Sequence, residues 1–242
     1  APQQCPPTVP MVELPLAAVH LWHFSLRATA PQAYEWLAPG EQQRYNRLRH
    51  PQAQQQFLAA HGALRGILAH YLALAPQELH LDTHPGGKPW LPECPELQFN
   101  LSHSHQQGIL VVGWQAPLGV DLEWHRPCQT LAIARRCFSE PEVHWLEQQH
   151  PQKRLQDFFR LWTIREAWSK WLGRGRRAWT DLVIDPHTLT LANQAQHVII
   201  IHTPPDYSGA LVMNTPMPIL TFTYSGQETM GKSRPFADRD PR

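Results

Sequence analysis

The sequence predicts an α+β protein made of two similar lobes, and three observations lead to this prediction. Apolar residues recur every three or four positions over residues 55–74, which is typical of an amphipathic helix, and a second long helical stretch covers residues 151–172. Short apolar stretches of the length of β-strands flank each helix. A boundary near Pro117 divides the chain into two halves with this same content. We therefore expect each lobe to pack a small antiparallel sheet against one long helix.

The composition favours a globular enzyme over a binder of nucleic acid or membranes. The chain has 242 residues, with 21 Lys and Arg against 20 Asp and Glu, so its net charge of +1 attracts no polyanion as a whole. It has no apolar run of about 18 residues and no signal-peptide pattern, which favours a cytoplasmic protein. Cys5, Cys94, Cys128 and Cys137 form no C-x-x-C pair, so we expect free thiols.

The N-terminal lobe, residues 1–117, is expected to alternate short strands and helices around its long helix. In chain order we expect a loose Pro-rich segment at 1–10, a strand at 19–22, short helices at 31–37 and 42–49, the helix at 55–74, a strand at 80–82, and a hairpin of strands 97–104 and 108–114.

Three basic side chains of this lobe are candidates for holding an anion. Arg44 and Arg47 are three positions apart, so on a helix they share one face. Lys88 follows Gly86 and Gly87 in a turn where the backbone can approach a ligand closely. A solvated basic face is the alternative for the arginines, and a turn lysine alone means little.

The hairpin is expected to present Ser102 and His103 near its turn. Such a pair could act as nucleophile and base, could donate hydrogen bonds to a phosphate, or could form a polar turn without a ligand. No G-x-S-x-G motif surrounds Ser102, so among the functional alternatives we favour phosphate donors over acyl transfer.

The C-terminal lobe, residues 118–225, opens with an apolar strand that carries two acids, Asp121 and Glu123. Successive side chains of a strand point to opposite faces, so these two carboxylates point the same way. Two carboxylates held close together need a cation or strong donors, which makes them candidate ligands of Mg²⁺ or Mn²⁺. A solvated strand edge with alternating acids is the alternative.

Two helices of this lobe carry further candidates. Ser139 and Glu142 fit a capping box, so a structural cap is the alternative to a chemical role of Glu142. Glu166 and Lys170 share one face of the long helix, an arrangement that also describes an ordinary surface ion pair. Beyond this helix we expect strands at 182–184, 188–191, 198–201 and 219–223, and a disordered tail over 226–242.

Five motifs in a fixed order resemble those of the 4′-phosphopantetheinyl transferases of the larger, surfactin-synthetase-activating class. They are Gly-Lys-Pro at 87–89, Phe-Asn-Leu-Ser-His-Ser at 99–104, Gly-Val-Asp-Leu-Glu at 119–123, Phe-Ser-x-x-Glu at 138–142 and Trp-Thr-Ile-Arg-Glu-Ala-x-x-Lys at 162–170. The resemblance runs from residue 40 to about 225, and the order of the motifs makes it specific.

The resemblance implies a pseudo-dimeric monomer whose active site lies in the cleft between the lobes. It implies a holo-[acyl-carrier-protein] synthase that transfers the 4′-phosphopantetheine arm of coenzyme A to a serine of an apo acyl, peptidyl or aryl carrier protein. The products would be the holo carrier and adenosine 3′,5′-bisphosphate. It also implies a divalent cation, Mg²⁺ or Mn²⁺, held by the C-terminal lobe, while the N-terminal lobe anchors the nucleotide end.

The resemblance also assigns roles to single residues. It matches Asp121, Glu123 and Glu166 to the metal ligands, Glu142 to a proposed base, Lys170 to a lysine at the leaving phosphate, Ser102 and His103 to the phosphate-binding pair, and Lys88 and Arg44, with Arg47 beside it, to the coenzyme A anchors. Arg165 stands where a Lys is usual, and His61 stands where an Arg is common.

Two other classes of function fit the same residues. A divalent-metal-dependent phosphohydrolase or nuclease would use the same carboxylates with water as nucleophile. A binding module would hold coenzyme A without turnover. If the transferase interpretation holds, Arg174, Arg176 and Arg177, just beyond the long helix, are expected to dock an acidic carrier protein.

Overall fold

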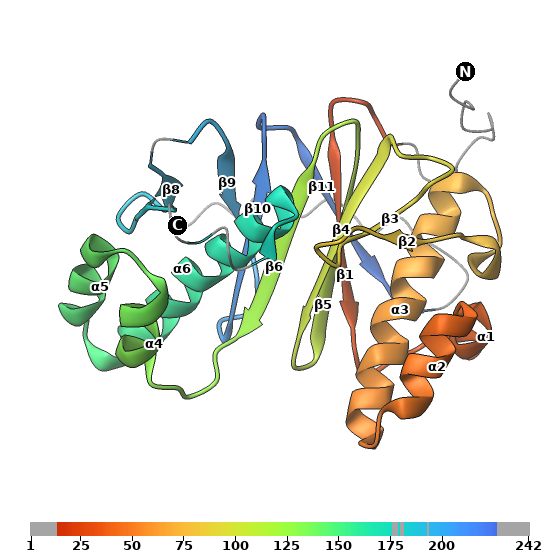
Figure 1. The fold of residues 1–242 in the computed structure, drawn as a ribbon, viewed down its shortest axis with the longest axis horizontal. Helices are drawn as coiled ribbons and strands as arrows, with labels where there is room; N and C mark the ends of the chain where they lie inside the picture. The colour runs from red at the N-terminus through yellow and green to blue at the C-terminus, as the bar shows by residue number, and fades with distance from the viewer. Residues whose placement is uncertain (1–13, 176–178, 180–181, 193, 227–242) are drawn as a thin grey trace, which may run out of the picture.

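The computed structural model describes residues 14–175, 179, 182–192 and 194–226, and it has the mixed α+β architecture that the sequence predicts. The long helix of the N-terminal half, α3 (Pro51–Leu72), lies on the right in Figure 1, the long helix of the C-terminal half, α6 (Pro151–Leu172), lies on the left, and the strands lie between them. The expected loose segment at 1–10 and the expected tail after Gly226 lie outside the described residues.

Four strands form the first sheet: β1 (Val19–Ser25), β4 (Leu97–Ser104), β5 (Gln107–Trp114) and β11 (Ile219–Tyr224). Their order is β11-β1-β5-β4. The pairs β1–β5 and β4–β5 are antiparallel, and the latter is the expected hairpin. β11 pairs with β1 in parallel, so the last strand of the C-terminal half belongs to the sheet of the N-terminal half.

Three strands form the second sheet: β6 (Leu118–Trp124), β9 (His197–Ile200) and β10 (Tyr207–Met213). They are antiparallel in the order β6-β10-β9. The central strand, β10, was not predicted, because Ser208 and Gly209 interrupt its apolar pattern at the start. Its pairing places Ala210 opposite Asp121 of β6.

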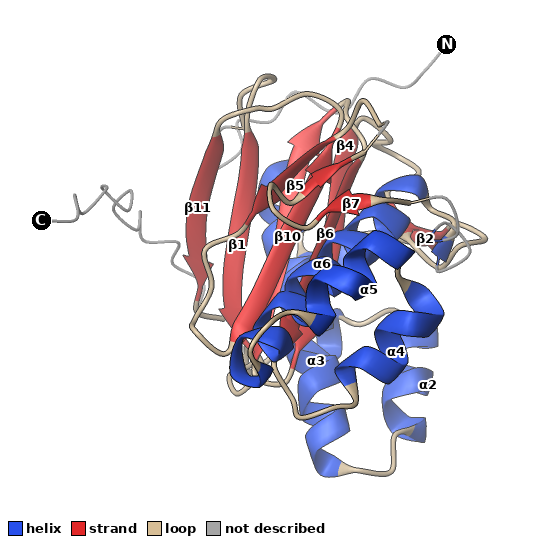
Figure 2. Ribbon diagram, turned by 90° about the vertical axis from the view of Figure 1, so that its left-hand side faces the viewer, coloured by secondary structure: helices blue, strands red, loops and turns tan. Residues whose placement is uncertain are grey.

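Side-chain alternation along the strands divides the core into three layers. Trp22 of β1 packs in the layer between the first sheet and α3. Val19 of the same strand and Leu211 of β10 share a layer between the two sheets, while Val212 packs in the layer with α6. The two sheets therefore pack against each other, and one long helix covers the other face of each. In side view, α3 and α6 lie along the same side of the strands (Figure 2).

The remaining elements are short. They are α1 (Ala33–Trp36), α2 (Pro39–Arg47), the 3₁₀ turn η1 (Pro76–Glu78), β2 (Asp82–Thr83), β3 (Pro89–Trp90), α4 (Thr130–Cys137), α5 (Glu140–Glu147), β7 (Ile184–Asp185) and β8 (Thr190–Leu191).

The limits of the long helices follow from residues at their ends. α3 begins at Pro51, earlier than its apolar pattern indicates, because proline needs no hydrogen bond in the first turn of a helix. It ends at Leu72, where Ala73 adopts the left-handed conformation with φ of 51°. α6 has the limits that the sequence predicts, and Gly173, with φ of 69°, ends it.

Two further expectations concern cysteines and membranes. Cys128 and Cys137 are free thiols as expected, but Cys94 is disulfide-bonded, so the expectation of free thiols is wrong for Cys94. Within the described ranges, no helix combines the length and the apolar character needed to cross a membrane.

Gly119 allows α6 to lie directly on β6. A Cβ atom at this position would lie 2.1 Å from the backbone oxygen of Ala167 and 2.4 Å from the backbone nitrogen of Trp171. Asp121 is two residues further along β6 and therefore points to the same face as this contact. The close approach of helix and strand thus sets how near the side chains of α6 come to that acid.

Gly119→Ala is expected to lower the free energy of unfolding by about 1–3 kcal/mol, because the added methyl group pushes against backbone atoms of α6. Denaturant unfolding measures the change. Gly40→Ala is the matched control: no atom of the described residues lies within 4 Å of its added Cβ, and alanine favours a helix, so stability should stay equal or rise slightly. Equal effects of the two substitutions would show that α6 does not depend on this contact.

His20 is a buried histidine in the layer between β1 and α3. Its Nδ1 lies 2.8 Å from the hydroxyl oxygen of Tyr71, which also accepts a hydrogen bond from Trp22 Nε1 at 2.7 Å. The Nε2 atom is buried without a hydrogen-bond partner among the described residues. Burial lowers the pKa of His20 to about 4, so the ring is neutral at physiological pH.

This histidine should make the fold sensitive to acid. Its pKa is lower in the folded than in the unfolded chain, so only the unfolded chain takes up the proton as pH falls from 6.5 toward 4, and stability is lost in that window. Unfolding free energies measured across it should fall more steeply for the wild type than for His20→Asn, which has no group that titrates there. His197→Asn, at an exposed position of β9, should keep the wild-type slope; equal slopes for all three proteins would contradict the assignment.

Candidate functional site

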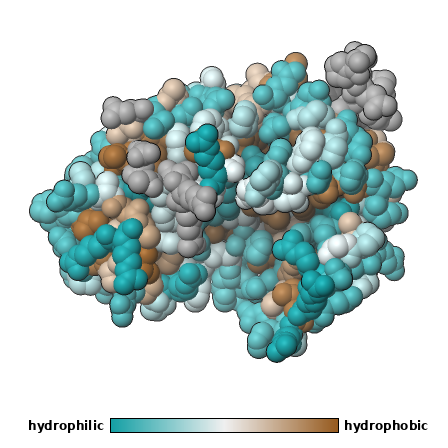
Figure 3. Space-filling model, in the orientation of Figure 1, coloured by the Kyte–Doolittle hydropathy of each residue, from teal (hydrophilic) through white to brown (hydrophobic). Residues whose placement is uncertain are grey.

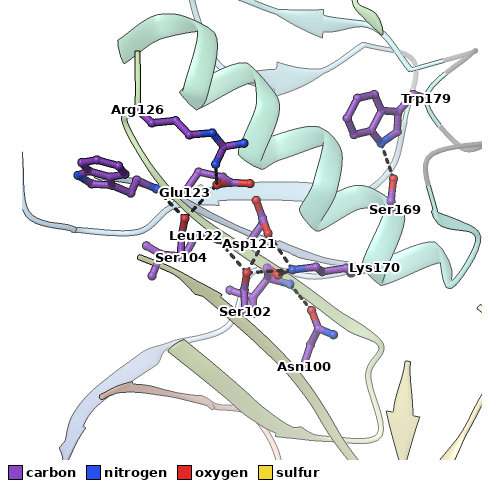
Figure 4. A network of polar contacts seen from close by, with 12 residues as sticks. Asn100, Ser102, Ser104, Asp121, Leu122, Glu123, Arg126, Ser169, Lys170 and Trp179 are labelled. Carbon is purple, nitrogen blue, oxygen red and sulfur yellow. Dashed lines mark hydrogen bonds and ion pairs between the residues drawn. The ribbon is translucent and has the colours of Figure 1, made fainter. Parts of the chain in front are cut away.

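Side chains of β4 cover the edge of β6 where the two sheets meet. Asn100 Oδ1 accepts a hydrogen bond from the backbone N–H of Val120 at 2.7 Å, and Ser102 Oγ accepts one from Leu122 at 3.2 Å. Ser104 Oγ accepts a third hydrogen bond from the backbone N–H of Trp124, the last residue of β6, at 3.1 Å. A spacing of two along β4 thus matches a spacing of two along β6, and this ladder joins the sheets (Figure 4).

The two serines of this ladder also hold the two acids of β6. Ser102 Oγ donates to Asp121 Oδ1 at 2.8 Å, and Ser104 Oγ donates to Glu123 Oε2 at 3.1 Å. The prediction that Asp121 and Glu123 point to one face is confirmed, since alternate serines of β4 bind both of them. Burial, and then the charge of Asp121, raise the pKa of Glu123. Arg126 lies 3.9 Å from the Glu123 carboxylate at the open end of the row.

Lys170 reaches the same row from α6. Its ammonium donates to Asp121 Oδ1 at 2.7 Å, to Ser102 Oγ at 2.9 Å and to the carbonyl of Val120 at 3.0 Å. The simple surface pair with Glu166 is therefore not the role of this lysine in the structure. Figure 4 shows three elements, β4, β6 and α6, converging on Asp121.

The carboxylate oxygens around Asp121 are suitable ligands for a divalent cation. Asp121 is almost completely buried, and its Oδ2 atom has no hydrogen-bond partner among the described residues, whereas Oδ1 has two. A buried, half-satisfied carboxylate next to a second acid is an oxygen site of the kind that Mg²⁺ binds.

The expected centre of three acids is not assembled in this conformation. Within the described parts of the chain, no group of three or more His, Cys, Asp or Glu side chains is arranged to hold a metal ion. Lys170 takes one oxygen of Asp121, and Glu166 lies one helical turn before that lysine, half-buried on α6. The metal role of Asp121, Glu123 and Glu166 stays a prediction.

His103 lies on the other face of β4 from Ser102, toward α3. Its ring is exposed at the surface, yet partial desolvation, followed by the positive charges of Lys170 and His61, lowers its pKa. His61 of α3 stacks on Phe57 and lies 2.8 Å, at Nδ1, from Glu41 Oε1. Ser102 and His103 thus point to opposite faces of β4, because neighbouring side chains of a strand point apart.

The other basic candidates lie in separate segments of the first half. Lys88 donates to the carbonyl of Leu118 at 2.7 Å, and burial lowers its pKa to about 8. The guanidinium of Arg44 lies over the Phe57 ring, 5.6 Å from its centroid, and Arg47 is exposed on α2. Their roles as coenzyme anchors stay predictions.

A pocket of about 470 Å³ lies between the halves at the Lys88 end of β6. Its lining includes the stacked rings of His84 and Trp90 from the first half, and Trp171 and Arg174 from the second. In Figure 3 the surface is hollowed between the two halves, and polar side chains cover most of this face. Of the three arginines expected to dock a carrier, Arg176 and Arg177 lie outside the described residues, and Arg174 shares this pocket with Lys88.

Glu142 is completely buried and is saturated with donors. It accepts hydrogen bonds from the backbone N–H and the hydroxyl of Ser139 at 2.7 and 2.5 Å, and from the backbone N–H of Ile184 at 3.2 Å. The buried guanidinium of Arg165 pairs with it and donates to the carbonyl of Leu182 at 3.1 Å. The capping box is confirmed, and this geometry favours a structural role. The base role stays a prediction.

Sequence reasoning missed two residues of the site, Asn100 and Ser104. Both lie in a strand at a spacing of two from Ser102. The signal was the alternation of polar and apolar residues over 97–104, which indicates a polar face that needs partners.

Comparison with known proteins places the chain in a family. Residues 117–212 match the family model described as the 4′-phosphopantetheinyl transferase superfamily. The chain is 34% identical over 176 residues to the 4′-phosphopantetheinyl transferase HetI of Nostoc sp. PCC 7120, which covers 70% of this chain and 74% of the relative. It is 27% identical over 173 residues to Sfp of Bacillus subtilis, covering 72% and 74%. It is 35% identical over 123 residues to AcpT of Escherichia coli K12, covering 50% and 60%.

These matches and the fold define the class first: the protein is an enzyme of the transferase class with an α+β fold. The chain belongs to the 4′-phosphopantetheinyl transferase superfamily, and the resemblance drawn from its motifs is confirmed.

Glu142→Gln separates a structural from a catalytic role. Loss of the buried charge leaves Arg165 unpaired, which should lower the free energy of unfolding by about 3–5 kcal/mol. Turnover of the protein that remains folded should stay within tenfold of wild type, whereas loss of a general base costs about 10²–10⁴ in rate. Melting curves and turnover per folded molecule are measured together. Glu147→Gln, at a partly exposed carboxylate of the same helix, should change neither.

Proposed function

We propose that this chain transfers the 4′-phosphopantetheine arm of coenzyme A to a serine of an apo carrier protein. The products are the holo carrier and adenosine 3′,5′-bisphosphate. Membership of the transferase superfamily supports the reaction class. The observation that carries the proposal is the convergence of Asp121, Ser102 and Lys170 from three separate elements on one buried point.

The pyrophosphate of coenzyme A fits this convergence. Asp121 and Glu123, with Glu166 nearby on α6, would hold the divalent cation, and when bound it neutralises charge on the phosphate oxygens. Ser102 and Lys170 supply a hydroxyl and an ammonium, which are donors that phosphate accepts. Little covalent chemistry is then required of the protein, and positioning of the two reactants dominates.

The transfer itself exchanges a phosphoanhydride bond of the coenzyme for a phosphodiester bond to the carrier serine. The serine hydroxyl of the carrier attacks the phosphorus that bears the pantetheine arm, and the bridging P–O bond to the nucleotide breaks. The serine proton leaves to a base, and the negative charge grows on the departing adenosine 3′,5′-bisphosphate. Lys170 donates to this charge, which stabilises the transition state more than the ground state.

The nucleotide end would occupy the pocket between the halves. Lys88 and Arg174 supply cations from opposite halves, and the stacked rings of His84 and Trp90 offer an aromatic wall. A pocket of about 470 Å³ is within the range of small-molecule sites. Because Arg174 shares this pocket, we assign it to the coenzyme rather than to carrier docking. Arg44 and Arg47 remain proposed anchors for the 3′-phosphate.

Intact mass spectrometry of an apo carrier protein tests the function. Incubation with this protein, coenzyme A and Mg²⁺ should add one phosphopantetheine to the carrier. Glu166→Gln should slow the gain steeply at low Mg²⁺, and Glu147→Gln, an exchange at a partly exposed acid, should not. Consumption of coenzyme A without a mass gain would indicate a phosphohydrolase instead, and coenzyme binding without either change would indicate a binding module. Acyl, peptidyl and aryl carriers tested in parallel identify the partner.

A further inference from the structure

We propose that Lys170 is the counter-ion of Asp121 in the coenzyme-free protein and that its charge keeps a divalent cation weakly bound there. When the phosphates of the coenzyme arrive, they replace Asp121 as the partner of the ammonium. This inference rests on the proposed function and assigns an order to the loading of the site. It concerns the coenzyme-free protein, before any chemistry.

The ammonium of Lys170 is fully satisfied where it lies. A lysine has three N–H donors, and the three acceptors are Asp121 Oδ1, Ser102 Oγ and the Val120 carbonyl, at 2.7, 2.9 and 3.0 Å. Only about 29% of this side chain is exposed. An ammonium with a complete set of oxygen partners at a partly buried point has the surroundings of a bound cation rather than those of a mobile surface lysine.

The two carboxylate oxygens of Asp121 differ in their hydrogen-bond partners. Oδ1 accepts from both Lys170 and Ser102, while Oδ2 is buried without a hydrogen-bond partner among the described residues. A divalent cation at Oδ2 would therefore lie within a few ångströms of the ammonium on Oδ1. Like charges so close repel strongly in a partly buried site. Asp121 can hold the cation well only when the ammonium has moved or has gained a second anion.

The neighbouring acid already has partners of its own. Glu123 accepts a hydrogen bond from Ser104 and lies beside Arg126 at the open end of the row. A phosphate bound next to Lys170 would accept hydrogen bonds from the ammonium, and this would free Asp121 Oδ1 for the cation. Metal and coenzyme should then strengthen each other's binding by the same factor.

Calorimetric titration with Mn²⁺ in the absence of coenzyme A tests the counter-ion. Lys170→Met removes the ammonium and keeps an unbranched side chain. It should tighten Mn²⁺ binding by roughly 10- to 100-fold, the range expected when a charged hydrogen bond no longer competes. Lys88→Met is the matched control, because that ammonium also donates to a β6 carbonyl, at Leu118, and has no carboxylate partner among the described residues. Its effect should stay below about threefold.

Two outcomes would overturn the proposal. Either Lys170→Met leaves Mn²⁺ affinity unchanged, or Lys88→Met raises it equally, which would reduce the effect to the general field of the protein. Lys170→Gln, which retains hydrogen-bonding groups, serves if the methionine variant folds poorly by its melting curve, and the same gain is expected of it. In the wild type, a saturating amount of coenzyme A should tighten Mn²⁺ binding far more than it does in Lys170→Met or Lys170→Gln.

The result is separable from the proposed function. If the wild type modifies a carrier but Lys170→Met binds Mn²⁺ no more tightly than wild type, only the counter-ion inference fails. If the wild type neither binds coenzyme A nor modifies a carrier, the transferase proposal fails, while the Mn²⁺ affinities still show whether Lys170 competes for Asp121.

Discussion

The free edge of β6 is the constraint on which the site depends. A strand edge must find partners for its backbone N–H and C=O groups, and no strand of the described part of the chain pairs with β6 on this side. Asn100, Ser102 and Ser104 accept from its N–H groups, and Lys88 and Lys170 donate to its carbonyls. The contacts that join the two sheets are thus also the contacts that bring two hydroxyl groups and the ammonium of Lys170 to the acids.

Local patterns predicted the parts of the fold that local physics decides. The period of apolar residues gave α3 and α6, and strand alternation gave the common face of Asp121 and Glu123, because both depend on neighbours in sequence. The pairing of β11 with β1 and the central position of β10 depend on contacts between distant segments. The ladder of hydrogen bonds from β4 to β6 was not predicted for the same reason. The sequence shows the polar alternation along β4, but it does not show which distant backbone groups the polar side chains bind.

The candidate site was predicted as a set of residues rather than as an arrangement. The motif order indicated Lys170 and Glu142 as chemical groups, yet sequence could not show that Lys170 lies on Asp121 or that Glu142 meets Arg165 in the interior. Both pairs bridge separate elements and hold α6 in place, together with its contact at Gly119. Fixing this helix from several sides keeps a charged side chain at a defined point, which catalysis by positioning requires.

The last strand, β11, pairs with β1 of the first sheet, and this pairing has a consequence for folding during synthesis. β1 lies between β5 and β11, and the ring of Trp22 stacks on Phe222 of that last strand. A nascent chain that ends before residue 219 leaves one side of β1 without its partner, so the first sheet can be completed only when nearly all the described sequence has left the ribosome. A separately produced N-terminal half would expose an unpaired, aromatic-rich strand edge and would be prone to aggregate.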